Sequence, residues 1–157
     1  MKNILLVAGV CAGLLSGAVF AADAAMAKPM KERKNVEFLN SGRFADFPFS
    51  DAVRVGNVTY FSGELGDVGG NGKLVPGGIQ AEAKQTMENI KASVESHGYK
   101  MSDVVKCTVF MADISEWSAF NAVYTSYFSK PYPARSAFGA NGLALGARVE
   151  VECIAAK

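Results

Sequence analysis

Histidine is almost absent from this chain, and cysteine is scarce. His97 is the single histidine among 157 residues, and the three cysteines are Cys11, Cys107 and Cys153. Zinc sites are built from several histidine or cysteine ligands, and a Ser-His or Cys-His triad needs an imidazole beside its nucleophile. The sequence therefore predicts no metal site, and any hydrolytic triad would depend on His97 alone.

Net charge is also nearly absent. The chain has 16 Lys plus Arg against 15 Asp plus Glu, a formal net charge of +1. A protein that binds nucleic acid needs a basic surface to neutralise phosphates. We therefore predict no nucleic-acid partner. Any chemistry must come from carboxylates, arginine, hydroxyls or backbone groups.

The start of the chain lacks charge altogether. No charged residue lies between Lys2 and Asp23, and residues 4–20 form an apolar run rich in glycine and alanine. A basic start followed by such a run is typical of a secretory signal peptide. We predict a signal peptide over residues 1–21, cleaved after Ala21 or, as a second choice, after Ala27. An uncleaved membrane anchor and a lipid on Cys11 are the alternatives.

Cleavage would make the protein periplasmic or secreted, with no attachment to a membrane. It would remove Lys2 and no acidic residue, which leaves 15 basic and 15 acidic side chains. Residues 22–34 have no pattern that forms a core and are expected to be a flexible leader. Residues 35–157 show no internal repeat and no linker, so they are expected to form one domain.

Hydrophobic periodicity predicts six strands and two helices in this domain. The expected strands are 36–39, 52–55, 58–62, 104–111, 136–140 and 149–154, and the expected helices are 79–97 and 117–127. Each helix has one apolar stripe, so both should pack on one face of a single sheet. The fold class is therefore α+β. His97 falls in the last turn of the first helix, where a cation suits the helix dipole, so a structural role is favoured over catalysis.

The glycine-rich segment 63–78 is expected to be a loop. It contains Gly72-Lys73, which suggests a phosphate-binding loop. However, Asp67 stands where the first glycine of that motif belongs, and Leu74 replaces its Ser or Thr. This hypothesis is rejected.

The last strand alternates between two kinds of side chain. Val149, Val151 and Cys153 point one way, whereas Glu150 and Glu152 point the other. Carboxylates on the face without helices need a wet cavity or a subunit interface, so we expect an oligomer. Cys107 and Cys153 both lie in expected strands. They are either buried thiols or a disulfide, since the sequence does not give the distance between their Cα atoms.

Two charged residues could carry chemistry. Arg135 opens a strand after Pro133-Ala134 and could hold a carboxylate with two parallel hydrogen bonds. The alternative is an ion pair on the surface. Glu150 could orient and deprotonate a water molecule, or it could be solvated or paired.

Several segments together resemble the RidA family, also called YjgF/YER057c/UK114. The similarity extends over about residues 35–156, and the spacing from Arg135 to Glu150 matches the family without a gap. The similar segments are Phe61-Ser62-Gly63-Glu64, Asp103-Val104-Val105-Lys106, Thr108-Val109-Phe110, Phe120-Asn121-Ala122-Val123-Tyr124, Pro133-Ala134-Arg135-Ser136-Ala137 and Val149-Glu150-Val151-Glu152.

The resemblance implies a chorismate-mutase-like α+β fold with a six-stranded sheet and two helices on one face. It also implies a homotrimer with ligand clefts between subunits. The implied activity is hydrolysis of reactive enamines and imines to 2-oxo acids and ammonia, with no metal or organic cofactor. The partner would be a small carboxylate or an imino acid.

The resemblance also implies the site residues. By position, Arg135 would grip the substrate carboxylate and Glu150 would hold the attacking water. The backbone of Gly63 and Ala137 would line the same cleft, with Ser62 and Asn121 nearby.

Some residues depart from the family pattern. Phe49 stands where a substrate-binding tyrosine is usual, and Ala137 stands where a cysteine is usual. Residues 139–145 replace a more polar and rigid family segment. We therefore expect an exported, divergent member with altered substrate specificity. The alternative functions are a non-catalytic trimer that binds small carboxylates or unfolded proteins and, from an older family name, a ribonuclease.

Overall fold

The computed structural model of the protein describes residues 35–43 and 46–157. The predicted signal peptide and the predicted leader lie outside these residues. In the part of the chain that is described, no helix has both the length and the apolarity needed to cross a membrane.

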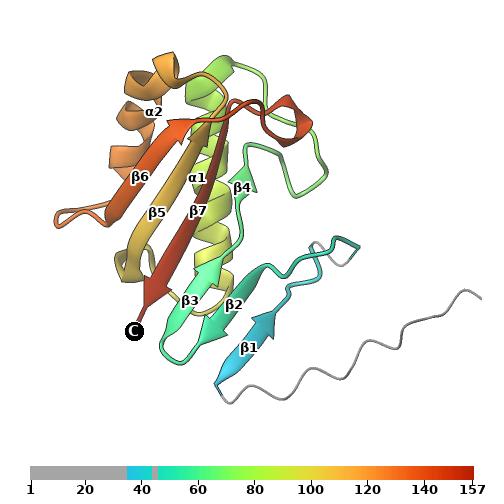
Figure 1. Cartoon of the computed structure of the whole chain (residues 1–157), viewed down its shortest axis with the longest axis vertical. Coiled ribbons are helices and arrows are strands. Elements are labelled where there is room, and N and C mark those ends of the chain that lie inside the picture. The colour runs from blue at the N-terminus through green and yellow to red at the C-terminus, as the bar shows by residue number, and fades with distance from the viewer. Residues whose placement is uncertain (1–34, 44–45) are drawn as a thin grey trace, which may run out of the picture. The chain divides into compact units, whose positions relative to one another are not determined.

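Within the described residues, the domain has seven strands and two α-helices (Figure 1). The strands are β1 (Val36–Leu39), β2 (Ala52–Val55), β3 (Val58–Phe61), β4 (Glu64–Leu65), β5 (Val104–Met111), β6 (Ala134–Gly139) and β7 (Val149–Ala156). The helices are α1 (Gly78–Ser96) and α2 (Trp117–Tyr124).

All strands join one sheet in the order β1-β2-β3-β7-β5-β6. Every pairing is antiparallel except that between β5 and β6. The long strand β7 is central, because it pairs with β5 on one side and with both β3 and β4 on the other. The α+β class and the two helices on one face are as the sequence predicts.

The core lies between the sheet and the two helices. The apolar stripe of α1 is fully buried there, since Ala83, Met87, Ile90 and Val94 are each 0% exposed. The helix ends at Ser96, and Gly98 follows two residues later with a φ of +84°, which suits glycine far better than other residues. From α2, Phe120 and Tyr124 complete the core.

The bounds of β3, β6, β7 and α1 differ from the predicted ones by one or two residues, and two differences are larger. β4 falls in the segment expected to be a loop. It forms because the backbone of Glu64 and Leu65 lies against that of Val151 and Glu150. The second helix was expected to reach residue 127, but it ends at Tyr124 and continues as a 3₁₀ turn, Thr125–Tyr127. At this end both the hydroxyl and the backbone N–H of Thr125 donate to the Asn121 carbonyl.

Cys107 and Cys153 form a disulfide. They are direct partners in the register of β5 and β7, and their Cα atoms are 4.1 Å apart. Both are 1% exposed and face the helices. The disulfide therefore joins the two longest strands inside the core.

The opposite face of the sheet has no helix on it within residues 35–43 and 46–157. We call it the open face. A row of cross-strand partners runs across it from Phe38 through Val53 and Tyr60 to Ile154. Phe110 and Phe138 pack edge to face further along, with ring centroids 5.0 Å apart. Phe38, Tyr60 and Phe138 are about half exposed, so this face presents apolar surface to its surroundings.

Candidate active site

The residues predicted to form the site fall into two groups in a single chain. Gly63, Phe49 and Glu150 lie together at a cavity of about 370 Å³. Arg135, Ala137 and Asn121 lie elsewhere, on β6 and α2.

Glu150 defines the first group. It follows the buried Val149 on β7, and the alternation along the strand directs its side chain to the open face. Gly63 lies directly against it, because a Cβ atom built on Gly63 would be 2.1 Å from Oε1 of Glu150. A side chain at position 63 would have to displace the Glu150 carboxylate, so glycine lets the backbone line the cavity beside it.

The carboxyl group of Glu150 is half-buried. Burial raises its pKa above the usual value, and the nearby charge of Glu152 raises this pKa further. A carboxyl group with a raised pKa is a stronger base once it is ionised, which suits the activation of a water molecule.

Phe49 reaches the same cavity from the loop before β2. The hydroxyl of Ser62 donates to the carbonyl of Ser50, at 2.7 Å. Ser62 does not itself line the cavity. Instead it ties the end of β3 to the residue next to Phe49 and holds this loop near Gly63.

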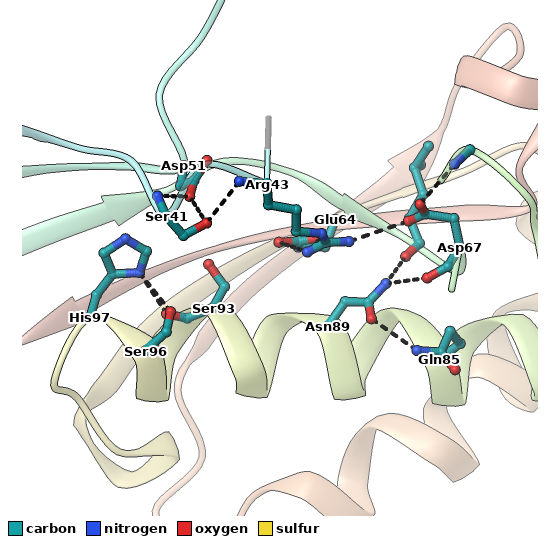
Figure 2. A network of polar contacts seen from close by, with 12 residues as sticks. Ser41, Arg43, Asp51, Glu64, Asp67, Gln85, Asn89, Ser93, Ser96 and His97 are labelled. Carbon is teal, nitrogen blue, oxygen red and sulfur yellow. Dashed lines mark hydrogen bonds and ion pairs between the residues drawn. The ribbon is translucent and has the colours of Figure 1, made fainter. Parts of the chain in front are cut away.

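Arg43 pairs with Glu64 and Asp67 (Figure 2), and both of these acids line the cavity. Nη1 of Arg43 lies 3.0 and 2.9 Å from the two carboxylate oxygens of Glu64, and Nη2 lies 3.5 Å from Asp67. Burial raises the pKa of Glu64 to about 7, although Arg43 opposes this change.

The glycine-rich loop is fixed to α1 by Asn89. Its side-chain amide donates to the carbonyls of Leu65 and Asp67, each at 2.8 Å (Figure 2). The carboxylate of Asp67 in turn accepts from the backbone N–H of Gly72, at 3.2 Å. These contacts shape the wall of the cavity that faces Glu150.

Arg135 defines the second group. Its guanidinium carbon lies 4.6 Å from the ring centre of Trp117 and 4.5 Å from that of Tyr124, so two aromatic rings hold it in place. Ion pairs found among the described residues do not include Arg135. The expected alternative, a surface ion pair, is therefore absent from residues 35–43 and 46–157, and the guanidinium can receive an external carboxylate.

Two buried polar atoms on α2 lack a hydrogen-bond partner in the described part of the chain. Oδ1 of Asn121 and the hydroxyl of Tyr124 are buried without a hydrogen-bond partner among the described residues. Burial also raises the pKa of Tyr124 to about 12, which keeps its hydroxyl neutral. Ala137 follows two residues after Arg135 on the same side of β6 and packs against the core. A ligand or a second copy of the chain could supply the missing partners.

The two groups lie on opposite faces of the sheet. Arg135 is the register partner of Cys107, which faces the helices, whereas Glu150 faces away from them. One chain therefore does not bring Arg135 and Glu150 to the same substrate.

His97 takes the structural position that the sequence predicts. It ends α1, and its Nδ1 lies 2.8 Å from the carbonyl of Ser93, which can only accept a hydrogen bond. Its ring packs edge to face on Phe61. Across the residues described, no group of three His, Cys, Asp or Glu side chains could hold a metal ion.

Sequence reasoning missed the Arg43–Glu64 pair and the aromatic support of Arg135. An acid between Gly63 and Leu65, inside a short extended segment, could have indicated a buried carboxylate that needs a cation. Only the fold reveals that Arg135 lies over Trp117 and Tyr124.

Two helices cover one face of the sheet, a cleft surrounds Glu150, and aromatic rings hold Arg135 on the other face. This arrangement is that of an α+β protein of the chorismate-mutase-like type. The chain matches the family described as Endoribonuclease L-PSP over residues 42–157. It belongs to this family, which is the RidA/YjgF family that its sequence resembles.

Individual relatives agree with this assignment. A protein of Capra hircus named 2-iminobutanoate/2-iminopropanoate deaminase is 46% identical over 108 residues, which are 69% of this chain and 79% of that protein. The crystal structure of yeast YEO7 matches with a TM-score of 0.72 at 36% identity and covers 78% of this chain and 98% of that one. RidA from the Antarctic bacterium Psychrobacter matches with a TM-score of 0.68 at 37% identity, over 80% of this chain and 100% of that one.

Proposed function

We propose that the protein is an imine deaminase that hydrolyses reactive imino acids to 2-oxo acids and ammonia. The observation that carries this proposal is Arg135, which two rings hold in place and which has no carboxylate partner among the described residues. Names of relatives such as 2-iminobutanoate/2-iminopropanoate deaminase support the same activity.

The proposed reaction needs positioning more than activation, because an imine carbon is already electrophilic. Arg135 binds the substrate carboxylate with two parallel hydrogen bonds. Glu150 accepts a proton from water as the water oxygen bonds to the imine carbon. The electron pair of the C=N bond moves to the nitrogen, which takes a proton from solvent, and this gives the carbinolamine. The carbinolamine then collapses: its nitrogen takes the proton from Glu150 and leaves as ammonia, while the hydroxyl group releases its proton to solvent and becomes the carbonyl. Glu150 is thereby regenerated as a carboxylate.

We further propose that the active unit is a homotrimer in which Arg135 of one copy meets Glu150 of the next. Two observations favour a shared cleft. The two residues lie on opposite faces of one sheet, and the open face has an apolar row that another copy could cover.

We also propose that the protein is exported, because the sequence predicts a signal peptide. The Cys107–Cys153 disulfide is consistent with it, because disulfides form and persist mainly in oxidising compartments.

The test generates imino acids in place with an amino-acid oxidase and follows formation of the 2-oxo acid. The purified protein should accelerate this step. Arg135→Ala should lower the acceleration by on the order of 100-fold, whereas Lys91→Ala, on the exposed side of α1, is the control. If the wild-type protein and Arg135→Ala both give the rate of buffer, the proposal is wrong.

A non-catalytic trimer that binds small carboxylates is the second candidate. Phe49 favours it, since this cavity residue has no hydroxyl to donate to a substrate. This candidate predicts that 2-oxo acids raise the melting temperature while no imine is turned over. Turnover that depends on Glu150 would exclude it.

A further inference from the structure

The cavity beside Glu150 has an apolar lining that the proposed reaction does not use. The rings of Phe47 and Phe49 lie next to each other, with centroids 5.5 Å apart, and form part of one wall. Leu65, Ala144 and Leu145 add aliphatic surface. Since the reacting carbon would lie near Glu150, this lining is where the substrate's own side chain would lie.

Leu145 is held in an unusual way. Its φ of +59° and ψ of +9° put it in the left-handed region, which an L-residue with a branched side chain rarely adopts. It is nevertheless 59% exposed, so burial in the core does not repay this conformation. Gly72 lies opposite, and a Cβ built on it would be 3.6 Å from Cδ1 of Leu145, an ordinary packing distance, so the side chain reaches across to the glycine-rich loop. An apolar side chain kept there at a conformational cost fits a role in binding.

The charges around the cavity also restrict what can enter. Glu64, Asp67 and Glu150 are acidic, and none of the described residues that line the cavity is a lysine, histidine or arginine. Arg43 is not among these lining residues, but its ion pairs with Glu64 and Asp67 neutralise part of this charge. A substrate side chain with a carboxylate would therefore meet repulsion, whereas an apolar one would bury surface.

We propose that this cavity is a side-chain subsite, and that the preferred substrates are imino acids with bulky aliphatic or aromatic side chains. This inference rests on the proposed imine deaminase function. It names the substrate class, and it assigns to Leu145 and Phe47 the role of determining specificity.

The first experiment compares imines generated from alanine, leucine and phenylalanine by an amino-acid oxidase. The imine from leucine carries three more carbons than that from alanine, so its kcat/KM should be about tenfold higher. Leu145→Asn removes the apolar wall while asparagine still tolerates the left-handed backbone. This variant should lower the leucine-to-alanine ratio of kcat/KM about fivefold. Ile114→Asn is the matched control, because Ile114 is also half exposed but lies outside the cavity.

A second measurement does not depend on turnover. Trp117 is the single tryptophan and lies against Arg135, so its fluorescence should respond to a bound carboxylate. Titration should show tighter binding of 4-methyl-2-oxopentanoate than of pyruvate, and 2-oxoglutarate should bind most weakly. Leu145→Asn should abolish the difference between the first two.

The outcomes separate the two proposals. If the alanine imine is hydrolysed at least as well as the leucine imine, and Leu145→Asn leaves the ratio unchanged, the subsite is wrong while the deaminase function stands. If no imine is hydrolysed faster than in buffer, the deaminase function is wrong and the substrate class falls with it.

Discussion

Glu150 and Glu152 lie two residues apart on β7 and share the open face of the sheet. The charge of Glu152 adds to the effect of burial in raising the pKa of Glu150. Because Glu152 is exposed, it can be changed without disturbing the core. This pair allows the base function of Glu150 to be tested without removing its carboxylate.

Glu152→Gln should lower the pKa of Glu150. Glu150 would then stay ionised to a lower pH, and the acid limb of the kcat/KM profile should move to lower pH. Glu95→Gln, an exposed acid on α1, is the control and should leave the profile unchanged. A profile that does not move in Glu152→Gln would contradict a role for Glu150 as the base.

Glu64 should make stability depend on pH. Burial raises its pKa to about 7 from an ordinary value of 4.5, so between these pH values the folded state holds a proton that the unfolded state releases. The free energy of unfolding should therefore fall as pH rises from 5 to 7, by less than about 1.4 kcal/mol per pH unit. Glu64→Gln removes this titration, and urea unfolding at pH 5 and pH 8 measures it. Equal pH dependence in both proteins would contradict the prediction.

The sequence identifies a site residue when the pattern that marks it lies within one segment, and it misses contacts between segments that are far apart in the chain. Glu150 was visible because alternation within one strand assigns its face. Arg43 and Glu64 were not, because 21 residues and several turns separate them and only the fold brings them together. The aromatic contacts of Arg135 were hidden for the same reason, since they join a strand to a helix.

At the level of elements, strand β5 was predicted at its observed bounds and α1 to within one residue at each end. Both have strong periodicity and clear stop signals. β4 was missed because a strand of two residues is too short to show a hydrophobic alternation. It exists only because it pairs with the neighbouring strand β7. The disulfide was left open because the register of β5 against β7 is a property of the sheet.

The disulfide should contribute substantially to stability. It links residues 46 positions apart, so reduction should lower the free energy of unfolding by about 2–4 kcal/mol. Urea unfolding with and without a reductant measures this difference. A double variant, Cys107→Ala with Cys153→Ala, should be insensitive to the reductant. If reductant leaves the wild-type midpoint unchanged, the disulfide has no stabilising role.

At the scale of the whole molecule, the sheet has one face covered by helices and one face open in a single chain. The sequence predicted this from the single apolar stripe of each helix and from the carboxylates of β7. The structure adds the apolar row on the same face, which strengthens the argument for association. The arrangement of the copies is a property of the assembly, so neither the strand pattern nor one chain defines it.

Phe138→Asp should break the association. Phe138 is 47% exposed on the open face, and a carboxylate there would be costly to bury against another copy. Sedimentation should give the mass of three chains for the wild type and a smaller mass for the variant. Tyr132→Asp is the matched control, because Tyr132 is also 47% exposed but lies outside the sheet. A wild-type protein that sediments as one chain would contradict the trimer.

Because Arg135 and Glu150 lie on two faces of one sheet, two different inactive variants should restore activity when they assemble together. A chain that lacks the arginine still carries an intact glutamate, and the reverse is also true. Two inactive proteins, Arg135→Ala and Glu150→Ala, should therefore complement each other when they are unfolded, mixed in equal amounts and refolded together. Random assembly would restore roughly a quarter of the clefts. A mixture as inactive as its components would mean that each chain builds its cleft alone.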